Sequence, residues 1–198
     1  MKPIRWLVPV IAGVLLAMAV PAVATPITWA FSGTVYAIAD DADQMGGIVH
    51  VGDLYTATWV FDSATPDLDS IDFWGRYAGL SATLTMPGFS VAKTGDLSVL
   101  NGTSSFDWLV FNTPQPGIRF LASLQDNTLA ALSSDALPTQ IDISDFPDRY
   151  LGVWWDPGPA KFFASIDSVS VTFIPEPGMF GLILLGLTGL RMRARRGA

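Results

Sequence analysis

Two clusters of aspartate combine the residue type and the loop setting that calcium binding requires. In the first, Asp40, Asp41 and Asp43 come shortly before the Gly46-Gly47 pair. Calcium takes hard oxygen ligands from a flexible backbone. The match to an EF-hand loop fails, because Met45 stands where an oxygen ligand belongs. The alternative is a solvated turn, since aspartate side chains bond their own backbone in turns.

The second acidic cluster has the same two interpretations. Asp67, Asp69 and Asp72 follow Asp62 within a short polar stretch that contains a proline. These three residues are the second candidate set of calcium ligands. Apart from calcium at one of these clusters, we expect no cofactor.

Aromatic residues offer a different chemistry, because a flat ring can stack on the C–H surface of a sugar. The chain has seven tryptophans and four tyrosines. Trp74 lies in a loop-like stretch, and the adjacent Trp154 and Trp155 point to opposite faces if they lie in a strand. Trp74 and Trp155 are therefore the candidate sugar-binding residues. The alternative is packing in the core, where large aromatic side chains dominate small β domains.

The residues for acid–base catalysis are scarce. Two of the three residues Asp142, Asp145 and Asp148 are candidates for the carboxyl pair of a glycoside hydrolase. Their spacing in a loop does not establish the distance between carboxyl groups that this reaction needs. The lone histidine, His50, is a candidate general base, but no partner nucleophile can be identified in the sequence. With no cysteine and only one glutamate, most catalytic triads and all cysteine-ligated metal sites are excluded. We therefore expect a protein that is not an enzyme.

Charge divides the chain into three parts. Residues 25–173 have five lysines and arginines against 17 aspartates, a net charge of −12, while basic residues gather at both ends. An acidic middle repels phosphates, so we expect no nucleic-acid partner. Such a charge can attract cations.

The first 24 residues are typical of a secretory signal peptide. Lys2 and Arg5 precede the uncharged run Trp6–Val20, and Ala22 and Ala24 are the small residues that signal peptidase accepts, with cleavage after Ala24. A permanent membrane anchor is the alternative. The apolar run is 15 residues long, short of the roughly 20 that a spanning helix needs.

Residues 174–198 form a second special segment. Two prolines, Pro175 and Pro177, flank Glu176, and a short apolar run, Met179–Leu190, follows. The chain then ends in a basic cluster that contains Arg191, Arg193, Arg195 and Arg196. An apolar run followed by arginines favours a stop-transfer segment with its arginines in the cytoplasm. Twelve apolar residues are marginal for a stable span, so we expect a transient membrane helix.

Together, the Pro-Glu-Pro motif, the short apolar stretch and the terminal arginines resemble the PEP-CTERM sorting signal of Gram-negative bacteria. That resemblance implies processing by an exosortase after transient anchoring in the inner membrane, and delivery to the cell surface or the medium. Members of the class tend to occur in bacteria that make exopolysaccharide and biofilm. Phe61–Asp67 and Leu132–Pro138 look like segments of its uncharacterised members. Middle domains vary widely within the class, so the resemblance implies an address and no activity.

The middle of the chain has the pattern of an all-β domain. Short segments rich in valine, threonine and aromatic residues are divided by glycine, proline, asparagine and aspartate. We expect strands at 27–38, 54–61, 80–86, 89–92, 97–100, 106–111, 118–124, 128–132, 150–155 and 162–173. Residues 118–124 and 128–132 are expected to form a hairpin, and 133–148 a long loop with one helical turn.

Strands at this density predict an antiparallel β-sandwich or jelly roll. The expected organisation is a signal peptide with its helix (1–24), a β-sandwich domain (25–173) and a sorting segment with a short hydrophobic helix (174–198). The leading functional prediction is an exported, surface-sorted, structural or adhesive protein of the extracellular polysaccharide and biofilm matrix. The alternative is a carbohydrate-binding module, calcium-assisted or not. Signal peptidase and exosortase are the expected processing partners.

Overall fold

The computed structural model describes residues 25–40, 45–102, 105–156 and 158–173. The strands of this part are β1 (Pro26–Ala39), β2 (Leu54–Asp62), β3 (Trp74–Met86), β4 (Phe89–Leu100), β5 (Asp107–Asn112), β6 (Ile118–Asp126), β7 (Asp148–Trp155), β8 (Lys161–Ser165) and β9 (Ser168–Phe173), with the short 3₁₀ turn η2 at Ile143–Asp145. No helix in these four stretches is long and apolar enough to cross a membrane.

Several predictions concern residues outside this described part. Both expected terminal helices lie there, as do Ala22, Ala24, Asp41, Asp43, Pro175, Glu176, Pro177, Arg191, Arg193, Arg195 and Arg196.

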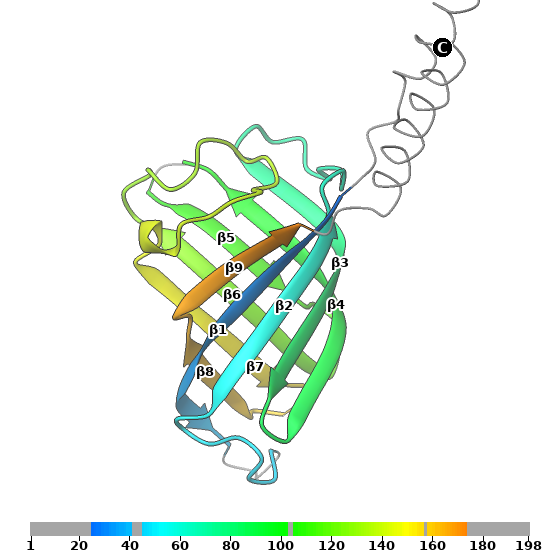
Figure 1. Ribbon diagram of the computed structural model, residues 1–198, viewed down its shortest axis with the longest axis vertical. Helices are drawn as coiled ribbons and strands as arrows, with labels where there is room; N and C mark the ends of the chain where they lie inside the picture. Colours follow the sequence, from blue (N-terminus) through cyan, green and yellow to red (C-terminus); the bar gives the residue numbers. More distant parts are fainter. Residues whose placement is uncertain (1–24, 41–44, 103–104, 157, 174–198) are drawn as a thin grey trace, which may run out of the picture. The chain divides into compact units, whose positions relative to one another are not determined.

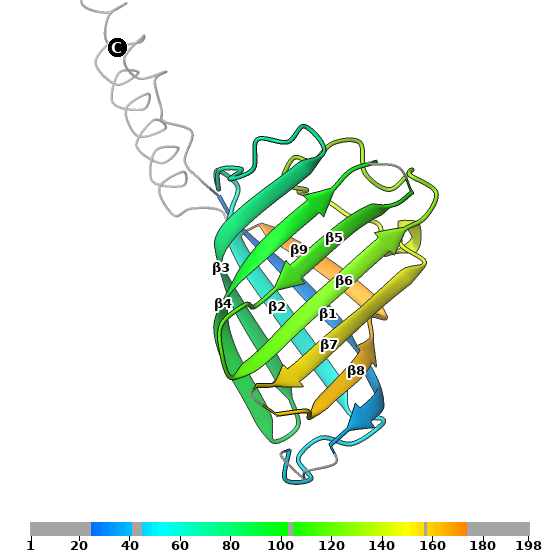
Figure 2. The ribbon, with the colours of Figure 1, turned by 180° about the vertical axis from the view of Figure 1, so that it is seen from behind.

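The strands form one antiparallel sheet that closes on itself. From β2 to β8 each strand pairs with the next one along the chain, and β1 pairs with both β2 and β8. The result is an eight-stranded barrel, with β9 added on β1 alone (Figures 1 and 2). The expected mainly β, antiparallel architecture is confirmed, but the two-layer sandwich is wrong.

Closure depends on the length and the irregularity of β1. Residues 26–34 of this strand pair with β2, and residues 35–39 pair with β8. The register shifts between Val35 and Ala37, and such a bulge bends a strand and increases its twist. Alternation of inward and outward side chains is the same in a sandwich and a barrel. The sequence pattern therefore predicts the strands without predicting the closure.

Strands β8 and β9 lie end to end along the same edge of β1. β8 pairs with the second half of β1 and also with β7, whereas β9 pairs with residues 27–32 of β1. The N–H of Asp167, between the two strands, donates to the carbonyl of Ser32 at 2.8 Å. Beside the second half of β1, the barrel wall therefore continues through β8 to β7. Beside the first half of β1, β9 is the last strand of the described residues.

Aromatic rings fill the interior of the barrel. Phe111 lies with its ring centroid 5.1 Å from that of Phe31, 5.3 Å from Trp29 and 5.4 Å from Trp59, and Phe120 lies 5.3 Å from Trp59. All five side chains are fully buried. Eight strands enclose a space that side chains can just fill. Core packing, the alternative to sugar stacking, thus accounts for Trp29 and Trp59.

One predicted hairpin is wrong. Residues 128–132 form no strand, because the carboxylate of Asp126 accepts hydrogen bonds from the backbone N–H groups of Thr128, Ala130 and Ala131. This arrangement folds the backbone after β6 into a turn in which Leu129 has a φ of 62°. The expected loop with one helical turn is confirmed up to residue 147, since η2 lies within it and β7 begins at Asp148. We call the whole segment between β6 and β7, residues 127–147, the long loop.

Candidate functional site

Two buried carboxylates hold the long loop at one end of the barrel. Asp107 on β5 and Asp126 on β6 are paired across the two strands, and their exposed fractions are 0% and 2%. Oδ1 of Asp107 accepts from Gly102 N–H and Oδ2 from Leu132 N–H, both at 2.9 Å. Backbone N–H groups, first that of Ala130 and then that of Thr128, hold the pKa of Asp126 below its usual range.

These two residues are structural anchors that the sequence prediction did not single out. Asp107 is a polar residue inside the apolar segment 106–111. A buried carboxylate needs hydrogen-bond donors. A single aspartate in an apolar segment was therefore the sequence feature from which this anchor could have been predicted. Its bond to Leu132, together with those of Asp126, fixes the start of the loop that covers the barrel end.

The first predicted calcium ligand of each acidic cluster bonds the backbone. Oδ2 of Asp40 accepts from Met45 N–H at 2.7 Å. Oδ1 of Asp67 accepts from Asp69 N–H at 2.9 Å and from Arg76 N–H at 2.8 Å.

In the second cluster, Oδ1 of Asp69 accepts from Ser70 N–H at 2.8 Å, and Asp72 is two residues before β3. The described residues contain no group of three or more potential metal ligands. These contacts are the bonds from aspartate side chains to backbone N–H groups that the solvated-turn interpretation expects. Calcium binding at either cluster stays a prediction.

The carboxyl groups considered for hydrolysis have similar roles. The Ser144 hydroxyl, and then its backbone N–H, hold the pKa of Asp142 below its usual range. Oδ2 of Asp148 accepts from the side-chain amide of Asn127 at 2.7 Å. A glycosidase general acid needs a raised pKa, so Asp142 has the wrong shift for that role. His50 is exposed, and its Nδ1 lies 3.6 Å from Oδ2 of Asp53.

An aromatic strip lies on the outer face of β7 and β8. Its members are Tyr150, Trp154 and Phe163, which are all partly exposed. The ring of Phe163 lies 6.2 Å from that of Tyr150 and 6.0 Å from that of Trp154, with an interplanar angle of 88° to the latter. We call these three residues the outer aromatic strip.

Gly152 determines how the outer aromatic strip is arranged. It lies directly opposite Phe163 in the β7–β8 ladder. A Cβ at Gly152 would lie 2.4 Å from Cη2 of Trp154, so the indole lies over the glycine. The indole remains partly exposed in this position, so its surface is accessible to contact from outside.

Charged side chains flank the outer aromatic strip. Arg119 on β6 and Lys161 on β8 are the cross-strand neighbours of Trp154. Nε of Arg119 lies 3.7 Å from Oδ2 of Asp156. Ring surface with nearby hydrogen-bond donors and acceptors is the combination that a sugar ring, with its C–H faces and hydroxyl rim, can contact.

The two predicted sugar-binding tryptophans lie elsewhere. Trp155 packs on the inner face of β7, with its ring 5.6 Å from Phe89 and 6.0 Å from Phe162. Trp74 begins β3 and is 37% exposed. Three other apolar residues close to it in the chain, Leu68, Ile71 and Phe73, are also exposed. We call these four residues the Trp74 patch. Trp154 was missed because adjacent tryptophans do not reveal which one faces outward.

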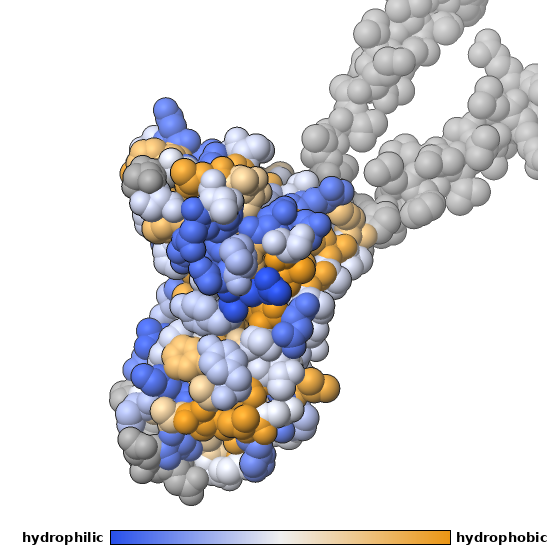
Figure 3. Space-filling view, turned by 90° about the vertical axis from the view of Figure 1, so that its left-hand side faces the viewer, coloured by the Kyte–Doolittle hydropathy of each residue, from blue (hydrophilic) through white to orange (hydrophobic). Residues whose placement is uncertain are grey.

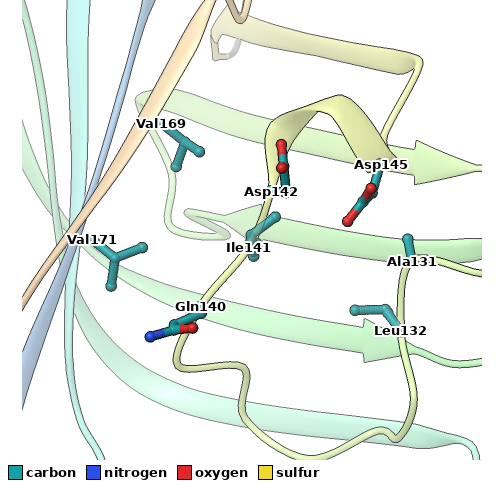
Figure 4. A pocket seen from close by; sticks show the side chains of 8 residues that line it. All are labelled: Ala131, Leu132, Gln140, Ile141, Asp142, Asp145, Val169 and Val171. Carbon is teal, nitrogen blue, oxygen red and sulfur yellow. The ribbon is translucent and has the colours of Figure 1, made fainter.

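A groove of about 410 Å³ lies between β9 and the long loop. Val169 and Val171 line it from β9, and Leu132 and Ile141 line it from the loop (Figure 4). In the space-filling view, apolar surface on this side of the molecule is bordered by hydrophilic residues (Figure 3). The groove is the third candidate surface, after the outer aromatic strip and the Trp74 patch.

Comparisons of the chain with protein-family models, with curated proteins and with solved structures found no match. The fold defines an eight-stranded antiparallel barrel with a packed interior. A binding function for such a barrel belongs to its outer surface and its loops.

Proposed function

We propose that this chain is an exported, surface-sorted protein without enzymatic activity that adheres to the polysaccharide matrix around a Gram-negative cell. In this proposal the outer aromatic strip is the surface that contacts the glycan. The observation that carries it is the position of Trp154, whose partly exposed indole lies over Gly152 on the outer face of β7.

The contact follows from the chemistry of the strip. A sugar ring stacks its C–H face on the indole of Trp154, and Phe163 at 88° to that indole forms a side wall. Arg119 and Lys161 donate hydrogen bonds to hydroxyl or carboxylate oxygens at the rim of the sugar. Ring contacts of this kind add about 0.5–1.5 kcal/mol beyond area burial, so single sites bind weakly and repeated sites along a polymer are needed for adhesion.

The sorting part of the proposal rests on the termini. The described strands lie within residues 26–173, and Pro175 follows the last of them by two positions. Signal peptidase cleavage after Ala24 and exosortase processing near Pro175–Pro177 would therefore leave each of those strands intact. The Pro-Glu-Pro motif and the basic cluster Arg191–Arg196 support this route.

Binding of the full chain, kept in a non-ionic detergent, to exopolysaccharide purified from its native host tests the proposal. We expect Trp154→Ala to weaken binding up to about tenfold, from the ring-contact energy above. Trp74→Ala is the matched control, because it removes a partly exposed tryptophan outside the outer aromatic strip. Unchanged binding by Trp154→Ala, or no binding by the natural chain, would contradict the proposal.

A calcium-assisted carbohydrate-binding module at the Trp74 patch is the second candidate. It is favoured by the partial exposure of Trp74 next to the loop with Asp67, Asp69 and Asp72. In that case Trp74→Ala and a calcium chelator would each abolish binding, while Trp154→Ala would not. The same two variants therefore separate the two candidates.

A further inference from the structure

Strand β9 leaves one edge of the sheet open. Among the described residues β9 has a single strand neighbour, β1. Natural sheets protect such an edge with lysine, proline, a bulge or a covering segment, because unpaired N–H and C=O groups accept a further strand. The sequence of β9, Ser-Val-Ser-Val-Thr-Phe, contains neither a charge nor a proline.

The backbone groups at this open edge can be assigned from the register. Because Asp167 N–H donates to the Ser32 carbonyl, the backbone of Ser32 faces β9. Alternate residues face the same neighbour in an antiparallel ladder, so Ser170 is bonded to β1. The N–H and C=O groups of Val169 and Val171 therefore point away from β1, toward the open edge.

The groove supplies side-chain contacts beside the same edge. Val169 and Val171 are paired with Phe31 and Trp29, so their side chains lie on the inner face of the wall. Across the groove, Ile141 comes from the long loop (Figure 4). A strand added at this edge would put alternate side chains against Val169, Val171 and Ile141, which is the arrangement that strand-addition sites use.

The charged lining of the groove selects the partner. Asp142 and Asp145 line it, and no lysine or arginine does. The whole segment from residue 25 to residue 173 has a net charge of −12. A second copy would bring carboxylates against carboxylates, whereas a basic segment is complementary.

We propose that the open edge of β9 and the adjoining groove bind an extended polypeptide segment in which apolar residues alternate with lysine or arginine. The segment adds to β9 as a further strand and bonds the backbone of Val169 and Val171. Its apolar side chains enter the groove beside Ile141, and its cations lie near Asp142 and Asp145. This site is separate from the outer aromatic strip and does not depend on the glycan-binding proposal.

The probe is a capped hexapeptide of alternating lysine and valine, added to the full chain in a non-ionic detergent at low salt. Hydrogen exchange is the first readout. We expect the peptide to slow exchange of the Val169 and Val171 amides, while Ser170, already bonded to β1, changes little. A peptide with N-methyl groups on alternate residues of one edge, and one with glutamate in place of lysine, are the controls and should leave exchange unchanged.

Two variants give an independent test by titration. Val171→Pro removes an N–H that none of the described strands uses, so it keeps the ladder with β1 but blocks strand addition. We expect it to abolish peptide binding. Asp145→Asn keeps the shape and removes one charge, and should weaken binding about two- to fivefold at low salt, with a smaller loss at high salt.

Several results would overturn the proposal. Equal binding of the peptide to Val171→Pro and to the natural chain would place the site elsewhere, as would protection away from β9. A dimer of the natural chain in sedimentation that Val171→Pro dissociates would assign the edge to a second copy. Peptide binding that appears only after residues 191–198 are removed would assign it to the chain's own basic tail.

Discussion

Replacing Phe111 by alanine removes the ring at the centre of the barrel interior. Phe111 has no exposed surface, and its ring lies between 5.1 and 5.4 Å from those of Phe31, Trp29 and Trp59. Removing a buried phenylalanine lowers the free energy of unfolding by about 3–5 kcal/mol, since it loses transfer energy and leaves a cavity. We expect the upper part of this range, because the neighbouring side chains come from β1 and β2, whose shared ladder limits how far they can move into the cavity.

Urea unfolding of the full chain, followed by tryptophan fluorescence, measures this loss. With a slope of about 1–3 kcal/mol per molar urea, the midpoint should fall by at least about 1 M. The matched control is Phe173→Ala, because Phe173 is 43% exposed at the end of β9, and it should change stability by about 0.5 kcal/mol or less. A loss below about 1 kcal/mol for Phe111→Ala would refute a packed interior and would indicate a barrel that can hold a ligand.

Three further predictions follow from single contacts. Gly152→Ala should keep the fold but weaken glycan binding, because the added Cβ displaces the indole of Trp154; unchanged affinity in the polysaccharide assay would count against the outer aromatic strip. The pKa of Asp126 is lowered in the folded state, so its stabilising effect is present above about pH 4 and is lost as the pH falls through the folded pKa. The protection factors of the long-loop amides, which are corrected for the intrinsic pH dependence of exchange, should therefore fall below about pH 4, and constant protection factors would contradict the role of this carboxylate as an anchor. Burial, and then nearby aspartates, raise the pKa of Tyr77 to about 12, so its stabilising effect is lost as the pH rises from 10 toward 12; a Tyr77→Phe variant that loses phenolate absorbance near pH 10, relative to the natural chain, would contradict this.

Period-two alternation was sufficient to predict most of the individual strands. Leu80–Met86 alternates apolar and hydroxyl side chains, and it lies within β3 with the apolar set buried. The boundaries were less predictable where pairing determines them. Residues 89–92 and 97–100 form the single strand β4, because β3 pairs along its whole length.

Closure of the sheet depends on contacts between distant parts of the chain. β1 must pair with β2 on one edge and with β8 on the other, more than 100 residues later, and no local pattern contains that information. The same limit applies to the site. The sequence pattern placed Trp154 and Trp155 in the strand that became β7, but it did not show which of them faces outward. The structure shows that Trp154 does, because it lies over Gly152, which is paired with Phe163 on the outer face.

The long loop illustrates how polar side chains override a strand pattern. Residues 128–132 were predicted to be a strand, yet four donors from Thr128, Ala130 and Ala131 converge on Asp126. Aspartate competes with the ladder for backbone N–H groups in this way. The outcome creates the groove beside β9, so the surface that we propose for peptide binding depends on this anchor.

The intact mass of the protein from its native host, in membrane, surface and medium fractions, tests most directly that the chain is exported and surface-sorted. The account predicts a product that begins at Thr25, ends near Pro175–Pro177 and is recovered outside the cell with exopolysaccharide. A membrane-bound product that still ends at Ala198 would contradict it, because Met179–Leu190 would then be a lasting anchor.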